Sequence, residues 1–345
     1  MRLYNKAQGR SAPWGDYVGK RDMSDLKNII VWRGAVARTG GTVCEAIIKH
    51  LFQQAGYTCK PIAINDLKSW HERGQTSKDF QPILTYLETL QEGPYLGGSD
   101  CFFTPLFHSP VFRVVFVRRD LRQALASFRR MLQMPSSQIP AILDSWMYVY
   151  ENCMTLPTEQ CLVLDYDTEI LSLLPAVRRL ADFMGLSLSE KCLEETATLY
   201  NRDSVRNRLH LRATNALECL RDLQTKIHDE FACIEIRVFD RKEVFRIPKE
   251  AFDDTTQERS GKGQASTTLR ITLPDGSSIS LASNRDGRSF RLGPTNDIGE
   301  QPVGHFHLDH VTSTNQHWST DFTQEECRQI NHRLSAFLEK HGFEL

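Results

Sequence analysis

The sequence predicts an α/β fold in which helices flank a parallel sheet and a small β-rich insert precedes the C-terminal helix. Three observations predict it. Apolar runs typical of buried strands alternate with segments of helical period through residues 27–228. Strand patterns without helical segments between them follow over residues 229–302. Thr323 and Glu326 then form a capping-box signature ahead of a last amphipathic segment.

The composition excludes several classes of protein. The chain of 345 residues has 42 lysines and arginines against 43 aspartates and glutamates, a balance that argues against broad nonspecific nucleic-acid binding. A hydrophobic fraction of 40% is enough for a globular core. The apolar runs are far shorter than the roughly 20 residues of a membrane span, so no span is expected. Residues 1–22 lack the apolar stretch of a secretory signal, and nine cysteines without a C-x-x-C pair favour reduced thiols in the cytoplasm.

The expected elements of the α/β core follow a polar lead-in over residues 1–26. Buried strands are expected at residues 28–32, 57–64, 112–117 and 161–165. Helices are expected at residues 42–55, 121–134, 141–153 and 174–184. In a sheet of this kind, ligands bind at the carboxyl ends of the strands, in the loops that lead into helices.

The insert, residues 229–302, has a different pattern from the core. Strands are expected at residues 232–239, 244–247 and on both sides of a Pro-Asp-Gly turn within 269–281, whereas the Ser/Thr/Gly-rich residues 253–267 are expected to be loop. The C-terminal segment, residues 303–345, is expected to return to the core through a helix. Its apolar face contains Cys327, Ile330, Leu334 and Phe337, and Gly342 ends it.

The most informative segment is the loop at residues 33–42, Arg-Gly-Ala-Val-Ala-Arg-Thr-Gly-Gly-Thr, between the first strand and the first helix. Its glycines let the backbone approach a ligand, and the helix N-terminus offers free N–H groups to a phosphate. The phosphate loop of nucleotide triphosphatases requires G-x-x-x-x-G-K-[ST], but Gly41 stands in place of the lysine. The pattern therefore disfavours chemistry at an ATP γ-phosphate and leaves Arg38 as the available cation. A tight turn without a ligand is the alternative.

Residues 38–42, Arg-Thr-Gly-Gly-Thr, resemble the phosphosulfate-binding loop of the sulfotransferases. Ala37 and Val43 replace a proline and a tryptophan that are usual in that family. The resemblance implies a P-loop-type sheet in which this loop binds the 5′-phosphosulfate of a nucleotide donor.

Residues 117–127 resemble the 3′-phosphate motif of the same family, at the end of a strand that enters a helix. Arg119 and Ser127 are eight residues apart, as in the family, while Leu121 and Gln123 depart from its usual proline and aspartate. A guanidinium can bind a phosphate through two hydrogen bonds, and a hydroxyl on a helix can donate another.

Three further segments resemble the family in the expected order. Residues 163–167 resemble a strand end whose tyrosine often lies near the adenine of the donor, which makes Tyr166 a candidate cofactor contact. Residues 174–185 resemble the helix that follows, and residues 310–326 resemble the closing segment. The resemblance covers roughly residues 27–225 and 303–345.

The resemblance implies transfer of a sulfuryl group from 3′-phosphoadenosine 5′-phosphosulfate (PAPS) to a hydroxyl or amine, with no metal required. The acceptor would be a small molecule or a glycan, with no nucleic-acid partner, and a homodimer is an open alternative. In such a transfer the protein acts mainly by positioning and charge stabilisation. The implied cofactor-binding residues are Arg38, Thr39, Gly40, Gly41, Thr42, Arg119, Ser127 and Tyr166, with Arg38 also catalytic.

The general base is the least defined part of the prediction. His108 lies shortly before the 3′-phosphate strand and titrates near neutral pH, so it is the candidate. A structural histidine at this position, or a base among the carboxylates of residues 66–92, are the alternatives. A basic cluster on a later helix either attracts an acidic acceptor, closes over the donor, or forms a solvated face. It consists of Arg202, Arg206, Arg208 and Arg212.

The sequence also leaves other functions open. Kinases of nucleosides or small molecules share the P-loop sheet, although the missing lysine argues against them. The string His305, His307, Asp309 and His310 has the spacing of a zinc site and allows a metal-dependent hydrolase. A partner-binding module on an inactive core is a third alternative. Residues 113–130 contain six arginines and one acidic residue, a local positive charge that favours a doubly phosphorylated nucleotide.

Overall fold

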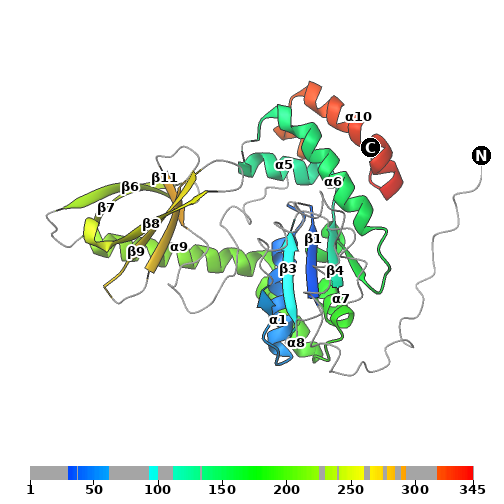
Figure 1. The fold of residues 1–345 in the computed structure, drawn as a ribbon, viewed down its shortest axis with the longest axis horizontal. Helices are drawn as coiled ribbons and strands as arrows, with labels where there is room; N and C mark the ends of the chain where they lie inside the picture. Colours follow the sequence, from blue (N-terminus) through cyan, green and yellow to red (C-terminus); the bar gives the residue numbers. More distant parts are fainter. Residues whose placement is uncertain are drawn as a thin grey trace, which may run out of the picture.

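Two sheets, each with its own hydrophobic core, organise the described part of the chain (Figure 1). The structure is a computed structural model. It describes residues 30–36, 38–61, 93–99, 112–132, 134–224, 230–238, 241–259, 265–274, 278–283, 289–292 and 317–344.

The first sheet is parallel and has the order β2-β3-β1-β4-β5. Its strands are β1 (Ile30–Ala35), β2 (Lys60–Pro61), β3 (Tyr95–Ser99), β4 (Phe112–Arg118) and β5 (Cys161–Asp165). From the central strand β1 the chain goes to β2 and β3 on one side, and β4 and β5 then lie on the other. The strand order therefore reverses between β1 and β4, which is where open α/β sheets bind ligands at the carboxyl ends of their strands.

The helices of the described chain, in order, are α1 (Gly41–Gln54), α5 (Leu121–Leu132), α6 (Ile139–Cys153), α7 (Leu174–Met184), α8 (Glu190–Tyr200), α9 (Arg202–Gln224) and α10 (Gln324–His341). Short helical turns occur at Ser136–Gln138, Tyr166–Ile170, Lys249–Ala251 and Trp318–Asp321, and the second of these is π-helical. None of the described helices is long and apolar enough to cross a membrane.

Helices cover both faces of the parallel sheet. Ile30 and Trp32 pack with α5, α6 and α10 on one face, whereas Val31 packs with α1, α7 and α8 on the other. Because successive side chains of a strand point to opposite faces, a strand buried on both faces must be apolar at every position, as at Val114–Val117. Each fully buried side chain of this size contributes about 1.5–3 kcal/mol to stability.

The expected fold class is confirmed: helices flank a parallel sheet, and a β-rich part precedes the C-terminal helix. The expected strand at 161–165 and helix at 174–184 match β5 and α7 at both ends. The first strand continues to Ala35, three residues beyond the expected end, because Arg33, Gly34 and Ala35 still pair with β4. The lead-in and residues 62–64 of the second expected strand lie outside the described residues. Of the rest of that expected strand, only Lys60–Pro61 pair as β2, and residues 57–59 are not in a strand.

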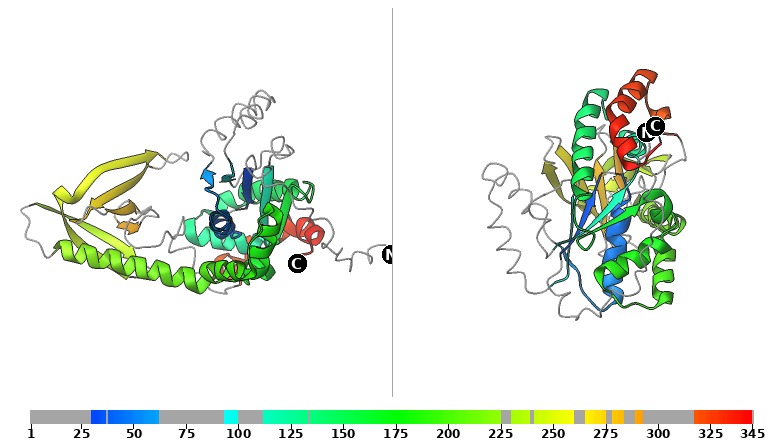
Figure 2. Two further views of the ribbon diagram at one scale, coloured as in Figure 1. Left: turned by 90° about the horizontal axis from the view of Figure 1, so that it is seen from below. Right: turned by 90° about the vertical axis from the view of Figure 1, so that its right-hand side faces the viewer.

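The second sheet has the order β7-β6-β11-β10-β9-β8, with all neighbours antiparallel except β11 and β6. Its strands are β6 (Phe231–Val238), β7 (Arg241–Pro248), β8 (Phe252–Arg259), β9 (Ala265–Thr272), β10 (Ser278–Ser283) and β11 (Ser289–Leu292). Figure 2 shows α9 running along one face of this sheet, where Ala213, Ala216 and Leu220 join its core. The hydrophobic core of the β-rich part thus begins within α9, and the domain boundary at residue 228 stays a prediction.

The expectation of a loop is wrong for residues 253–259 and 265–267, the described part of the range 253–267. Residues 252–259 and 265–272 form the antiparallel strands β8 and β9, with Thr256 opposite Thr268 and Gln257 opposite Thr267. The composition was misleading because strand pairing uses backbone groups, and β-branched threonine favours strands although it is polar.

The C-terminal helix α10 begins and ends as expected, with the Thr323–Glu326 capping box and Gly342 in a left-handed conformation. Ile330, Leu334 and Phe337 pack into the core beside α6. Arg122 of α5, which is only 6% exposed, also ties this segment to the core. Its guanidinium binds the Asp120 carboxylate at 2.7 Å and donates hydrogen bonds to the Asn331 side chain and the Glu344 carbonyl.

The contacts of Glu326 make the stability of the α10 attachment depend on pH. Burial raises the pKa of its carboxyl, but hydrogen bonds from Ser136, the Thr323 backbone and Arg129 outweigh this and lower the pKa from 4.5 to about 2. Since the folded-state pKa lies below the ordinary value, the ionised carboxylate stabilises the fold fully above about pH 4.5. This contribution is lost as the pH falls toward 2.

We predict that Glu326→Gln lowers the free energy of unfolding by about 1–2 kcal/mol at neutral pH, because glutamine keeps the capping geometry but loses the charge. Denaturant unfolding at pH 7, 5, 4, 3 and 2 checks this, and the difference from the native protein should shrink below about pH 4.5. Glu325→Gln, at an exposed carboxylate paired with Arg328, is the matched control and should change stability by less than about 1 kcal/mol. A difference that stays constant down to pH 2 would contradict the assignment.

Candidate anion-binding site

The loop between β1 and α1 has a backbone that few sequences adopt. Arg38 and Gly40 have φ angles of 69° and 89°, in the left-handed region. For arginine this conformation costs roughly 1–2 kcal/mol, and such strain is found mainly where the surroundings hold a functional geometry. A Cβ at position 40 would lie 3.1 Å from Ile170 Cγ2 and 3.2 Å from Tyr166 Cδ2, so any other residue would also crowd these two side chains.

The N-terminus of α1 is suited to an anion. Gly40 is the N-cap residue and offers no side-chain cap, and the first turn contains no acidic residue. The N–H groups of a first helical turn have no partners within the helix, and the helix dipole adds partial positive charge there. Gly41 and Thr42, both predicted to bind the donor, are the first two residues of this turn. The Thr39 hydroxyl is used inside the loop, since it donates to the Val36 carbonyl at 2.8 Å.

The two phosphate motifs predicted from the sequence meet at this loop. Arg38 Nε donates a hydrogen bond to Ser127 Oγ of α5 at 3.1 Å, across 89 residues of sequence. Arg119, directly after β4, donates from Nη1 to the Arg38 carbonyl at 2.9 Å. The structure therefore brings Arg38, Arg119 and Ser127 together, as expected if they share one ligand.

Arg119 retains donor capacity toward a ligand. Its Nε–H is buried and has no hydrogen-bond acceptor among the described residues. No described carboxylate lies within 4.0 Å of its guanidinium, which instead stacks 4.0 Å above the centre of the Tyr166 ring. A buried guanidinium N–H without an acceptor is costly to maintain, whereas a phosphate oxygen would satisfy it.

The other arginines of residues 113–130 have mostly structural partners. Arg118 binds Asp165 at 2.9 Å, Arg129 binds Glu326 at 2.8 Å, and Arg130 pairs with Asp321. Arg122 binds Asp120, as described above, and Arg113 donates to the Phe112 carbonyl. The count of six arginines therefore overstated the charge available to a ligand. Only the Asp120–Arg122 pair is close enough in sequence for its partnership to have been foreseen.

Tyr166 begins the π-helical turn after β5 and lies between the two motifs. Its ring edge faces Gly40 and one ring face lies under the Arg119 guanidinium. The predicted contact between Tyr166 and an adenine stays a prediction. Sequence reasoning missed Asp165, whose carboxylate accepts hydrogen bonds from Arg118 and from the backbone of the Tyr166 turn. Its only sequence signal is its place before Tyr166 at the end of a strand.

Several predicted residues fall outside the described part of the chain. These are the candidate base His108, the carboxylates of residues 66–92, and the string His305, His307, Asp309 and His310. Among the described residues, no group of three or more His, Cys, Asp or Glu side chains is placed to hold a metal ion.

The basic cluster lies at the start of α9 and is only partly solvated. Arg208 donates to the carbonyls of Ser204 and Leu199 and stacks over the Tyr200 ring at 5.6 Å. Burial lowers the pKa of Arg208 and of Arg212. Next to Arg208, Val205 and Leu209 pack against Val43 in the first turn of α1. The cluster thus lies on the helix that packs against the anion loop's helix, and its role stays a prediction.

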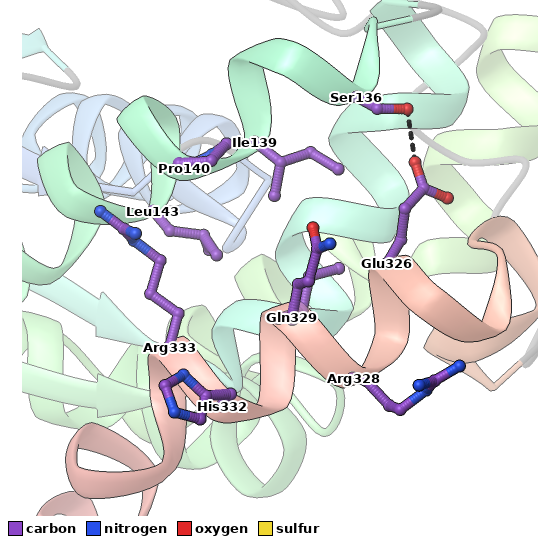
Figure 3. Close-up of a pocket in the computed structure, with 10 residues that line it drawn as sticks. Ser136, Ile139, Pro140, Leu143, Glu326, Arg328, Gln329, His332 and Arg333 are labelled. Atoms are coloured by element: carbon purple, nitrogen blue, oxygen red, sulfur yellow. Dashed lines mark hydrogen bonds between the residues drawn. The ribbon is translucent and has the colours of Figure 1, made fainter.

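A cavity of about 670 Å³ lies elsewhere, between α6 and α10 (Figure 3). Its lining includes the apolar side chains of Ile139, Leu143 and Ile330 and the charged side chains of Arg328 and Arg333. Both arginines are paired, with Glu325 and Asp144 respectively. None of the residues that meet at the anion loop lines this cavity, so we do not assign the predicted chemistry to it.

We predict that Gly40→Ala weakens anion binding and lowers the free energy of unfolding by about 2–4 kcal/mol, because it adds both backbone strain and contacts with Ile170 and Tyr166. Gly56→Ala is the matched control, since Gly56 has a similar φ of 84° but open space around its Cβ position. Denaturant unfolding should show a clearly smaller loss for the control. Equal losses would mean that Tyr166 and Ile170 do not confine the loop.

No protein-family model matches the chain, and no curated protein matches it in sequence. Among solved structures, mouse sulfotransferase SULT7A1 complexed with PAP is similar with a TM-score of 0.45 and 9% identity, covering 92% of this chain and 90% of that one. Retinol dehydratase is similar in two complexes. The complex with androsterone and the inactive cofactor PAP gives a TM-score of 0.34 and 15% identity, and the complex with retinol and PAP gives 0.35 and 14%. Both cover 53% of this chain and 67% of the other. All three TM-scores lie below 0.5, so the function proposed below rests on this chain's own residues.

Proposed function

We propose that the chain is a sulfotransferase that uses PAPS as the donor of a sulfuryl group. The observation that carries the proposal is the convergence of Arg38, Arg119 and Ser127 at the N-terminus of α1. These residues come from two sequence motifs that resemble the 5′-phosphosulfate and 3′-phosphate motifs of sulfotransferases. A turn without a ligand would not require two arginines to meet at one helix N-terminus.

The residues fit a donor with phosphates at two positions. The α1 N-terminus, with Gly41, Thr42 and Arg38, would hold the 5′-phosphosulfate through backbone N–H groups and the guanidinium. Arg119 and Ser127 would hold the 3′-phosphate, and the buried Arg119 Nε–H without a described acceptor supports this. When bound, the donor supplies the sulfuryl group and leaves as 3′-phosphoadenosine 5′-phosphate (PAP).

The chain's contribution to the reaction is positioning and electrostatics. Arg38 would stabilise the negative charge that builds on the 5′-phosphate oxygen as the bond to sulfur breaks. The acceptor, a hydroxyl or amine of a small molecule or glycan, would lose its proton to His108 or to a carboxylate of residues 66–92. A cytoplasmic location belongs to the same proposal and is supported by the free thiols of the described cysteines. A homodimer is also part of the proposal.

A P-loop kinase is the competing function, and donor binding distinguishes the two. The position at which such kinases need a lysine is Gly41, the first residue of α1. A kinase should be stabilised by ATP with Mg²⁺, whereas a sulfotransferase should be stabilised by PAP without metal.

We predict that PAP raises the thermal unfolding temperature of the native protein in the presence of EDTA, because a ligand that binds only the folded state stabilises it by mass action. At 100 times the Kd the stabilisation is about 2.7 kcal/mol. Differential scanning fluorimetry with PAP and EDTA, and with ATP and Mg²⁺, gives the comparison. Stabilisation by ATP with Mg²⁺ and not by PAP would contradict the proposal.

We predict that Arg119→Met weakens PAP binding about 10- to 100-fold, since it removes charge-assisted hydrogen bonds to a phosphate. Arg130→Met is the matched control, because Arg130 is an arginine of the same segment paired with Asp321 rather than facing the loop. Isothermal titration calorimetry should show a Kd for the control within about threefold of native. A Kd for Arg119→Met that equals that of the control would remove Arg119 from the donor site.

A further inference from the structure

We propose that Asp165 is a positioning residue that sets Arg119 and Tyr166 for recognition of the donor's 3′-phosphate. This inference rests on the proposed function, in which Arg119 binds that phosphate. Among the described residues, the hydrogen bonds of the Asp165 carboxylate go to Arg118, Asp167 and Thr168 and to none of the residues proposed to bind the donor's phosphates. Asp165 would therefore act through Arg119 and Tyr166, which directly follow Arg118 and Asp165 in the sequence.

The carboxylate of Asp165 joins two strands and a turn. Its Oδ2 accepts a hydrogen bond from Arg118 Nε at 2.9 Å. Its Oδ1 accepts hydrogen bonds at 3.0 Å from the backbone N–H groups of Asp167 and Thr168 and from the Thr168 hydroxyl. The Asp165 backbone N–H in turn donates to Glu169 at 2.8 Å. One side chain therefore fixes the end of β4 and caps the π-helical turn after β5.

The register of β4 and β5 places the residues fixed by Asp165 next to Arg119 and Tyr166. Arg118 and Asp165 are Cα partners at the ends of the parallel strands β4 and β5. Arg119 follows Arg118 after β4, and Tyr166 follows Asp165 after β5; the Arg119 guanidinium stacks on the Tyr166 ring at 4.0 Å. The Arg118–Asp165 ion pair lies one residue before this stacked pair on both strands, so it holds the two segments together where they leave the sheet.

The stacked pair of Arg119 and Tyr166 contacts the loop between β1 and α1 at two points. The Tyr166 ring lies against Gly40, and Arg119 donates a hydrogen bond to the Arg38 carbonyl. The Arg119 guanidinium is thus held by two contacts, the stack on the Tyr166 ring and the hydrogen bond from Nη1 to the loop. A guanidinium fixed in this way loses less conformational entropy on binding a phosphate than a free one.

The experiment measures selectivity for the 3′-phosphate rather than affinity alone. Isothermal titration calorimetry gives the Kd of adenosine 5′-phosphate divided by the Kd of PAP for each protein, since the two ligands differ by that phosphate. For Asp165→Asn we expect this ratio to fall about tenfold, because Arg119 is no longer held, while the Kd of adenosine 5′-phosphate changes by less than about threefold. Asp144→Asn is the matched control: it breaks an Asp–Arg pair between α6 and α10 and should leave the ratio unchanged.

A second pair of variants keeps the test decisive if Asp165→Asn does not fold. Tyr166→Phe keeps the ring and should keep the ratio, whereas Tyr166→Leu should lower it about tenfold. A ratio that is unchanged in Asp165→Asn or Tyr166→Leu, or equal losses for both ligands, would overturn the inference and leave the proposed function in place. Failure of the native protein to bind PAP would overturn both.

Discussion

The hydrogen bond from Arg119 to the carbonyl of Arg38 is the interaction on which the site depends. It joins the loops that follow β1 and β4, at the point where the strand order of the sheet reverses. Arg38 is held there in a left-handed conformation, and in that conformation its side chain reaches Ser127. Together with the hydrogen bond from Arg38 to Ser127, the bond from Arg119 joins the two motifs and brings two guanidinium groups to one helix N-terminus.

Neighbouring elements stabilise this arrangement. The Arg118–Asp165 ion pair and the capped turn after β5 fix Tyr166, on which the Arg119 guanidinium stacks. To one side, α10 binds α5, the helix that carries Ser127, through Arg122 and Arg129. The second sheet is attached through α9, whose first half packs on α1 and whose second half enters the core of that sheet. Charged residues near the site are thus used mostly to hold elements, and few are left for a ligand.

Much of the fold was predictable because its signals are local. The apolar strand 161–165, the helix 174–184 and the capping box at Thr323 are each specified by neighbouring residues, and each was found. The prediction of a loop was wrong for residues 253–259 and 265–267 because these strands are polar. Backbone pairing, rather than burial of every second residue, decides their structure. At the site, the motifs identified Arg38, Arg119 and Ser127. Partnerships such as Arg129 with Glu326, across 197 residues, have no local signal and required the structure.

The proposed donor site requires Arg119 and the α1 N-terminus to bind the two phosphate-bearing ends of one nucleotide. A crystal structure of the protein with PAP tests this directly. We expect a 3′-phosphate oxygen within about 3 Å of Arg119 Nε and the 5′-phosphate at the N–H groups of Gly41 and Thr42. PAP bound elsewhere, or bound with its 3′-phosphate away from Arg119, would contradict it.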